Sequence, residues 1–169
     1  TYCGICHGMD GEGYLAPQAN ALSNPEFLAA ATDEFLSEST IYGRPETKMS
    51  AWGDAANGPL TESQVDLIVE YMRAWETLPA ADIHTMTIEG DADNGAIVYA
   101  AHCDSCHASD GSGASAMSIN NSEFLRVASD GFIWHAIVYG RSNTTMQSYQ
   151  DVLTEQEIFD LVALIRSWE

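Results

Sequence analysis

The sequence predicts an all-α protein of two tandem domains that are related by internal duplication. A Cys-x-x-Cys-His motif occurs twice, at residues 3–7 and 103–107, and each copy is followed by the same later segments in the same order. The strand signal is weak throughout, and 169 residues that are 46% apolar can supply two small cores. We therefore expect domains at 1–78 and 92–169, joined by a linker at 79–91.

The matching segments recur at nearly constant spacing, as internal repeats do. The motifs and the Asp-Gly-x-Gly loops after them lie 100 residues apart, and the Tyr-Gly-Arg segments 42–44 and 139–141 lie 97 apart. The last segments, 60–76 and 153–169, lie 93 apart. Each begins with a capping box and continues with apolar residues at helical spacing, which predicts an amphipathic helix.

The two motifs are attachment sequences for c-type haem. Thiols one helical turn apart can add to the two vinyl groups at one porphyrin edge, and the histidine then reaches the iron from one face. The motifs contain every cysteine of the chain. The sequence therefore predicts two haem c groups, attached through Cys3, Cys6, Cys103 and Cys106, with His7 and His107 as iron ligands.

Each iron needs a second ligand or an open position. Met49 and Met146 are 97 residues apart, as the Tyr-Gly-Arg segments are, whereas the other four methionines have no methionine at the repeat-related position. We therefore expect His/Met ligation at both irons, which raises the reduction potential and leaves no position for substrate. The alternative is bis-histidine ligation of one haem through His84, His102 or His135.

Four further residues are candidates for contact with the haems. Arg44 and Arg141 precede the two methionines by five residues, and a guanidinium can bind a haem propionate through two hydrogen bonds. Trp52 and Tyr149 follow the methionines by three residues and could close the pocket or hydrogen-bond a propionate. A surface or packing role is the alternative for each.

With these residues in place, the chain resembles the class I cytochromes c, and in particular their tandem diheme, c-four-like type. The resemblance covers nearly the whole chain and rests on CGICHGMDGEG, CDSCHASDGSG, the methionine loops KMSAW and TMQSY, and the closing helices. It implies two cytochrome c domains in a periplasmic or extracytoplasmic electron carrier that is not itself an enzyme. Such a carrier passes single electrons between respiratory or other redox partners.

Two departures from that family stand out. Ser50 and Gln147 follow the methionines, where the family usually has proline. The second domain has a helix ahead of its motif, at 93–102, whereas the first has only two residues there. We therefore expect the first domain to lack its N-terminal helix, and the sequence to belong to a longer polypeptide with a membrane anchor or further domain. Without that helix, the face formed by Val65, Val69 and Met72 is expected to be exposed.

Other functions remain open at this point. The chain could be a diheme subunit or fragment of a larger redox enzyme complex, or a diheme peroxidase, in which one haem loses its distal ligand. A zinc site, a thioredoxin-like pair or structural disulfides would account for the cysteines but not for the histidine after each pair.

The chain is strongly acidic, with 25 acidic and six basic side chains and a net charge of -19. Such a surface repels nucleic acids, so nucleic-acid binding is excluded. The charge is consistent with steering of a basic redox partner, or with adaptation to high salt. No run of 18 or more apolar residues occurs.

Overall fold

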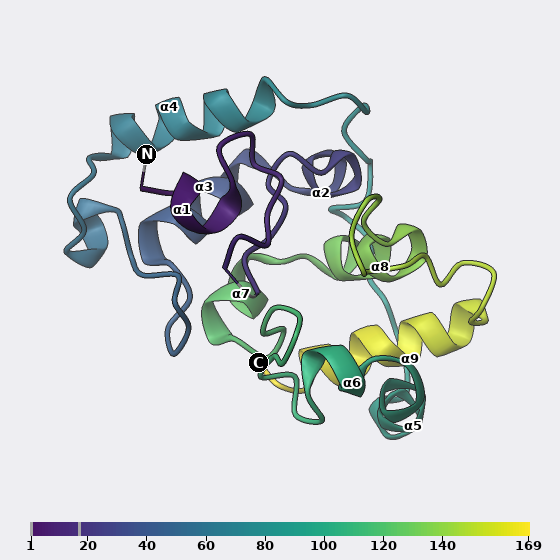
Figure 1. Ribbon diagram of the computed structural model, residues 1–169. Coiled ribbons are helices and arrows are strands. Elements are labelled where there is room, and N and C mark those ends of the chain that lie inside the picture. The colour runs from purple at the N-terminus through teal and green to yellow at the C-terminus, as the bar shows by residue number, and fades with distance from the viewer. Residues whose placement is uncertain (1, 17) are drawn as a thin grey trace.

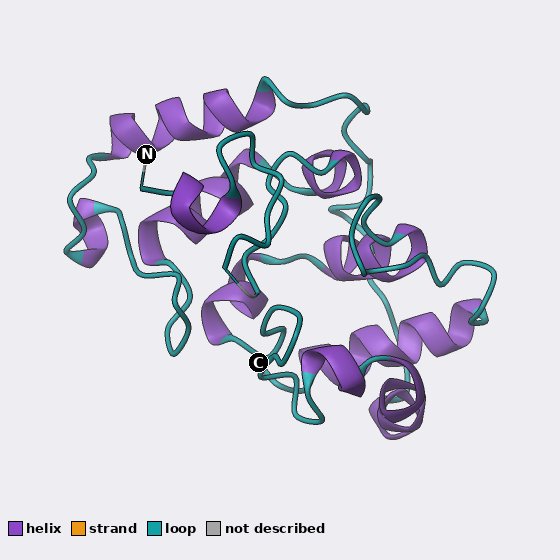
Figure 2. Ribbon diagram, viewed as in Figure 1, coloured by secondary structure: helices purple, strands orange, loops and turns teal. Residues whose placement is uncertain are grey.

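The computed structural model describes residues 2–16 and 18–169, so Thr1, where the expected first domain begins, lies outside it. In this part of the chain every regular element is a helix and no strand occurs (Figure 2). The prediction of an all-α fold is confirmed. No helix among these residues combines the length and the apolar character needed to cross a bilayer.

The two halves contain matching helices in the same order (Figure 1). The first half holds α1 (Gly4–His7), α2 (Pro25–Ala30), α3 (Asp33–Tyr42), the short 3-10 helix η1 (Asp54–Ala56) and α4 (Glu62–Arg73). The second half holds α5 (Ala92–His102), α6 (Asp104–His107), α7 (Ser122–Val127), α8 (Asp130–Tyr139) and α9 (Glu155–Arg166). The helices α1 to α4 correspond to α6 to α9, whereas α5 has no counterpart among the described residues.

Local sequence explains where these helices begin. Asn24 and Asn121 cap α2 and α7 through their side-chain oxygens, which accept from the backbone N–H three residues on. The predicted capping boxes are present at both closing helices: Thr61 N donates to Gln64 at 2.9 Å, and the equivalent bond from Thr154 to Glu157 is 2.8 Å.

The two halves share one aromatic core. Phe35 of α3 stacks on Phe132 of α8 with ring centroids 4.5 Å apart, and Phe27 and Phe124 meet these rings edge to face. The four residues are two repeat-related pairs. The halves therefore meet through the same surface on each, as in an isologous dimer.

Reciprocal hydrogen bonds surround this core. Asn24 donates its side-chain amide to the Ser142 carbonyl at 2.9 Å, and its counterpart Asn121 donates to the Pro45 carbonyl at 2.7 Å. Arg126 adds an ion pair across the junction, 2.7 Å from Glu38. These contacts fix the register between the halves.

The segment between the expected domains is packed against the protein. Ala81 N donates to the Ala29 carbonyl at 2.8 Å, and Ile83 is buried in the core. Gly90 lies so close to the Phe159 backbone that an added Cβ would be 2.4 Å from its carbonyl oxygen. The domain boundaries stay a prediction, but residues 79–91 do not form a free tether.

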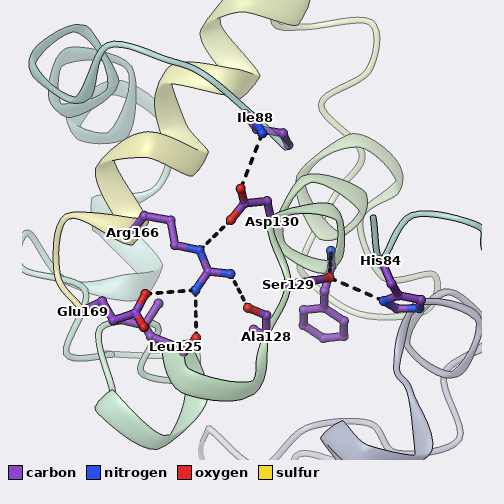
Figure 3. Close-up of polar contacts among 9 residues, drawn as sticks. His84, Ile88, Leu125, Ala128, Ser129, Asp130, Arg166 and Glu169 are labelled. Atoms are coloured by element: carbon purple, nitrogen blue, oxygen red, sulfur yellow. Dashed lines mark hydrogen bonds and ion pairs between the residues drawn. The ribbon is translucent and has the colours of Figure 1, made fainter. Parts of the chain in front are cut away.

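An arginine near the end of α9 ties this helix to α7 and α8 (Figure 3). The Nε of Arg166 lies 2.7 Å from Asp130, and its two terminal nitrogens donate to the carbonyls of Leu125, at 2.8 Å, and Ala128. Asp130 also accepts from Ile88 N, which extends the network to the segment before α5. One guanidinium thus satisfies two carbonyls at the end of α7 and one carboxylate of α8.

The first half has the same arrangement around Arg73. Its side chain contacts Asp33 at 2.7 Å and donates to the carbonyls of Leu28, at 2.8 Å, and Ala31, at 2.6 Å. Every one of these partners is the repeat-related counterpart of a partner of Arg166. The network is therefore a feature of each half that the duplication preserved.

The expectation that α4 exposes Val65, Val69 and Met72 is wrong. These three side chains are buried, because their face of α4 is turned toward α3 and the core. Leu67 and Tyr71, on another face of the helix, are 64% and 58% exposed. In the second half α5 packs against that face of α9.

We expect Arg166→Gln to destabilise the protein. The substitution leaves two carbonyls without their charged donor and Asp130 without its cation, which should lower the free energy of unfolding by about 2–4 kcal/mol. Urea unfolding followed by far-UV circular dichroism measures the change. Lys48→Gln removes the same charge from an exposed site and should alter stability by less than about 0.5 kcal/mol. Equal effects of both variants would contradict the assigned role of Arg166.

Candidate haem-binding sites

Both Cys-x-x-Cys-His motifs form a single helical turn. In the first, His7 N donates to the Cys3 carbonyl at 2.9 Å, and in the second His107 N donates to the Cys103 carbonyl at 3.0 Å. This turn brings the two thiols of each motif to one side of the backbone. All four cysteines are free thiols in the described structure, as attachment to a vinyl group requires.

The loop after each motif folds back against its histidine. Gly13 N donates to the His7 carbonyl at 2.7 Å, and Gly113 N donates to the His107 carbonyl at 2.8 Å. Gly13 has φ 79°, and a Cβ there would lie 2.5 Å from Ala21 N, so the loop can come this close only at a glycine. The Asp-Gly-x-Gly sequence is therefore explained by the turn it makes.

Each motif histidine is oriented by one backbone carbonyl. The Nδ1 atom of His7 lies 2.9 Å from the Asn20 carbonyl oxygen, and Nδ1 of His107 lies 2.9 Å from that of Met117. A carbonyl oxygen can only accept, so Nδ1 carries the proton and Nε2 keeps a free lone pair. Burial lowers the pKa of His107, which favours the neutral ring that a metal requires. Both rings are thus prepared for ligation through Nε2.

The two methionine loops have the same internal hydrogen bonds. Arg44 N donates to the Met49 carbonyl at 2.7 Å, and Arg141 N donates to the Met146 carbonyl at 2.8 Å. A glycine precedes each arginine with positive φ, 66° at Gly43, where a Cβ would be 2.5 Å from the Met49 oxygen. Met49 and Met146 therefore lie in loops of the same backbone conformation.

Sequence analysis did not identify the two threonines that brace these loops. Thr47 Oγ1 donates to the Arg44 carbonyl at 2.7 Å and accepts from Met49 N at 3.1 Å. Thr144 makes the same pair of bonds at 2.8 and 3.1 Å in the second loop. The available signal was a threonine two residues before each methionine. In both loops the residue after the methionine is not proline, and these hydrogen bonds restrain the backbone instead.

A cavity in the second half brings the predicted residues of that half together. Its lining includes Cys103, Cys106, His107, Met146, Arg141 and Tyr149. The first half contributes Tyr14, Asn20, Ala21, Asn24 and Phe27 to the same lining. The second site is thus completed by residues of the other half, which sequence analysis of each domain alone did not predict.

Arg44 and Arg141 lie at the junction of the halves. The Arg44 guanidinium is 5.7 Å from the Phe35 ring centroid and 5.8 Å from that of Phe124, and Arg141 is 5.6 Å from Phe132 and 6.0 Å from Phe27. Burial lowers the pKa of each arginine to about 10, so both remain charged at neutral pH.

Neither of these arginines forms an ion pair with a carboxylate in the described part of the chain. Partly buried cations without a counter-ion are unfavourable, so the position fits a group that brings carboxylates, as haem does through its propionates. Contact of Arg44 and Arg141 with propionates stays a prediction.

The two aromatic candidates differ in their contacts. Tyr149 is buried, lines the cavity and donates its hydroxyl hydrogen to the His102 carbonyl at 2.9 Å. Trp52 packs near Tyr2, with ring centroids 5.7 Å apart. The position of Tyr149 thus favours a role in closing the pocket. Contacts of Trp52 and Tyr149 with propionates stay predictions.

The other three histidines occupy different environments. His102 lines the cavity at the end of α5, His135 is buried in α8 against Tyr139, and His84 lies 3.4 Å from the Ser129 hydroxyl (Figure 3). Within residues 2–16 and 18–169, no group of three or more His, Cys, Asp or Glu side chains converges as a metal site requires. The cysteine pairs are thus not brought together as a shared zinc site requires.

Several known proteins are similar to this chain in sequence or in structure. Residues 90–165 match the family model described as Cytochrome C oxidase, cbb3-type, subunit III. The structure of the Kuenenia stuttgartiensis reducing HAO-like protein complex Kustc0457/Kustc0458 is similar over 99% of this chain and 91% of that chain, with 21% identity and a TM-score of 0.59. The fold is that of the c-type cytochromes.

Two further solved structures match about half of the chain each. The KustC0563 c-type cytochrome is 27% identical over 44% of this chain and 96% of its own, with a TM-score of 0.42. Cytochrome cL of Methylophaga aminisulfidivorans is 23% identical over 45% of this chain and 51% of its own, with a TM-score of 0.39. Residues 90–165, which match the family model, include the second attachment motif at 103–107.

We expect Ala108→Gly to stabilise this c-type cytochrome fold. Ala108 follows His107 with φ 64° and ψ 159°, a region that suits glycine, and its counterpart is Gly8 with φ 82° and ψ 157°. Relief of this strain should raise the free energy of unfolding by about 1 kcal/mol. Urea unfolding measures the change. Ala114→Gly, at a nearby exposed position without positive φ, should be neutral or destabilising, and the opposite order would contradict the assignment.

Proposed function

We propose that this protein is a diheme c-type cytochrome that transfers single electrons through two His/Met-ligated haems. The ligand pairs are His7 with Met49 and His107 with Met146, and the four cysteines form the thioether bonds. The observation that carries the proposal is the repeated bond from histidine Nδ1 to a carbonyl, which leaves Nε2 free in both halves. Two domains, 1–78 and 92–169, would each hold one haem.

The protein residues set the properties of each site. A carbonyl that accepts from Nδ1 increases the donor strength of Nε2 and holds the ring at a fixed angle. Met49 and Met146, in the threonine-braced loops, would supply the second ligand of each iron, and a soft thioether favours ferrous iron. When bound, haem supplies one-electron exchange at its iron. Arg44 and Arg141 would compensate the propionate charge at the junction of the halves.

We infer that the electron donor and acceptor are other redox proteins. The structural neighbour from Kuenenia stuttgartiensis is part of a reducing HAO-like protein complex, which supports either a free carrier or a subunit of a larger redox enzyme complex for this chain. We place the protein in the periplasm or another extracytoplasmic space, as its resemblance to exported cytochromes implies. This proposal includes a form that is attached to the membrane. Respiratory electron transport is the context we propose.

A haem count and a ligand spectrum test the proposal. The pyridine haemochrome assay should give two haem c per chain, and the ferric protein should show the weak near-infrared band of methionine-ligated haem. One haem per chain would contradict the diheme assignment. Rapid binding of peroxide or carbon monoxide would show an open iron and favour a peroxidase instead.

We expect Met49→Ala and Met146→Ala each to remove about half of the near-infrared band, because each variant deprives one of two irons of its thioether. Both should also lower the reduction potential of one haem while the haem content stays at two. Redox titration with absorbance detection measures both effects. Met86→Ala, in the segment between the domains, is the matched control and should leave the spectrum unchanged. A full band in either ligand variant would refute that ligand.

The acidic surface leads to a prediction about salt. Arg73, Arg126 and Arg166 form ion pairs, and Arg44 and Arg141 are partly buried, so the surface field is dominated by carboxylates. The association rate with a basic redox protein should fall about tenfold or more between low and physiological ionic strength. Stopped-flow mixing measures it. A flat response, together with higher unfolding free energy in molar salt, would indicate adaptation to high salt instead.

A further inference from the structure

The protein surface around the first attachment motif is apolar. Tyr2, Ile5, Met9 and Leu15 are 73%, 70%, 68% and 62% exposed, and all four lie in or beside the turn that holds Cys3 and Cys6. We call these four residues the first-motif patch. Clustered large apolar side chains on a strongly acidic surface often mark an interaction site.

The same positions in the second half carry polar residues. Ala16 N donates to the Cys6 carbonyl at 3.2 Å, and Ala116 N donates to the Cys106 carbonyl at 2.9 Å, so the two loops share one register. The counterparts of the patch are therefore His102, Ser105, Ser109 and Ser115, which are all exposed. The motif turns of the two halves thus share their register but differ in composition, and the loops diverge from Tyr14, which has φ 61° and donates its backbone N–H to the Ala19 carbonyl, whereas Ala114 N donates to the Cys106 carbonyl.

The patch is not a core face that has lost a covering helix. Leu67 and Tyr71 of α4 correspond to Asp160 and Leu164 of α9, which are buried next to α5. A helix like α5 would therefore cover Leu67 and Tyr71. It would leave the first-motif patch open, because the counterparts of the patch stay exposed although α5 is present.

We propose that the first-motif patch is the docking surface for a redox protein whose apolar contact area is surrounded by basic side chains, and that electrons enter or leave the protein here. The inference rests on the proposed function, because it places the partner beside Cys3 and Cys6, which would attach the first haem. The second site, with a polar surround and a cavity completed by first-half residues, exchanges electrons through the first.

Charge decides which occupant fits the patch. Asp10 and Glu12 are exposed in the same loop, and the chain as a whole carries a net charge of -19. Two copies of this protein would repel each other at this surface, whereas a basic partner is attracted and oriented. An apolar centre within a charged rim is the usual arrangement of a transient protein interface.

The double variant Ile5→Ser/Met9→Ser tests the proposal, since each substitution installs the residue that the second half carries. Ile97→Ser is the control, because Ile97 on α5 is also 70% exposed but lies in the second half. The probe is mitochondrial cytochrome c, a basic haem protein, and the first readout is its dissociation constant by calorimetry at low ionic strength. We expect about tenfold weaker binding for the double variant and less than a twofold change for the control.

Electron transfer gives the second readout. Photoexcited zinc-substituted cytochrome c serves as the protein donor, and laser-generated lumiflavin semiquinone serves as a small neutral donor. The double variant should lose about tenfold in rate with the protein donor and keep its rate with the small donor. Leu15→Ser, which installs the second-half residue outside the motif, should reproduce this pattern if haem attachment to the double variant is incomplete.

The possible failures are distinguishable. If the unaltered protein accepts no electron from either donor, the proposed function fails. If it accepts electrons but the patch variants behave like Ile97→Ser in both assays, the docking proposal is wrong and the proposed function stands. Concentration-dependent dimerisation of the unaltered protein that the double variant abolishes would also overturn the proposal, because the patch would then bind a second copy.

Discussion

The reciprocal packing of Phe35 and Phe132 is the interaction on which the arrangement of this protein depends. Each half has only a few helices and a core that is small for an independent domain. The stacked rings join these cores into one, and Asn24 and Asn121 fix the register from either side. The two repeats thus pack against each other through the same surface on each half.

The same junction determines the electrostatics of the interior. Arg44 and Arg141 lie against rings from both halves, where their charges are only partly solvated. Three other arginines serve ion pairs within or between the halves. The few cations of this acidic chain are therefore mostly engaged in holding the fold together. Its carboxylates are left to dominate the field that an approaching partner meets.

The duplication preserved the interior of each site more strictly than its surroundings. The histidine orientation, the glycine turn and the threonine-braced methionine loop are the same in both halves, bond for bond. The surface beside the attachment motif is apolar in the first half and polar in the second. The closing helix α9 is packed against α5, whereas the corresponding face of α4 is exposed. Two similar sites in different surroundings can exchange electrons with each other while only one contacts a partner. We propose that the first site is the one that contacts the partner.

Features that depend on local spacing could be predicted from the amino-acid sequence. One helical turn between thiols, the capping boxes at Thr61 and Thr154, and the all-α character follow from residues only a few positions apart. The repeat also indicated Met49 and Met146, and the structure places Met146 in the cavity with His107. These signals are visible because the interactions that produce them are nearly contiguous in the chain.

Which helix faces are buried, and which residues complete the second cavity, became visible in the three-dimensional structure. The face of α4 with Val65, Val69 and Met72 packs toward α3 and the core. The prediction that these residues are exposed was wrong because it did not include this contact between segments distant in sequence. Tyr14 and Asn24 reach the second cavity across the junction, which no spacing within one repeat could indicate. Burial depends on which surfaces meet in three dimensions, and two copies of one pattern acquire different neighbours once they pack against each other.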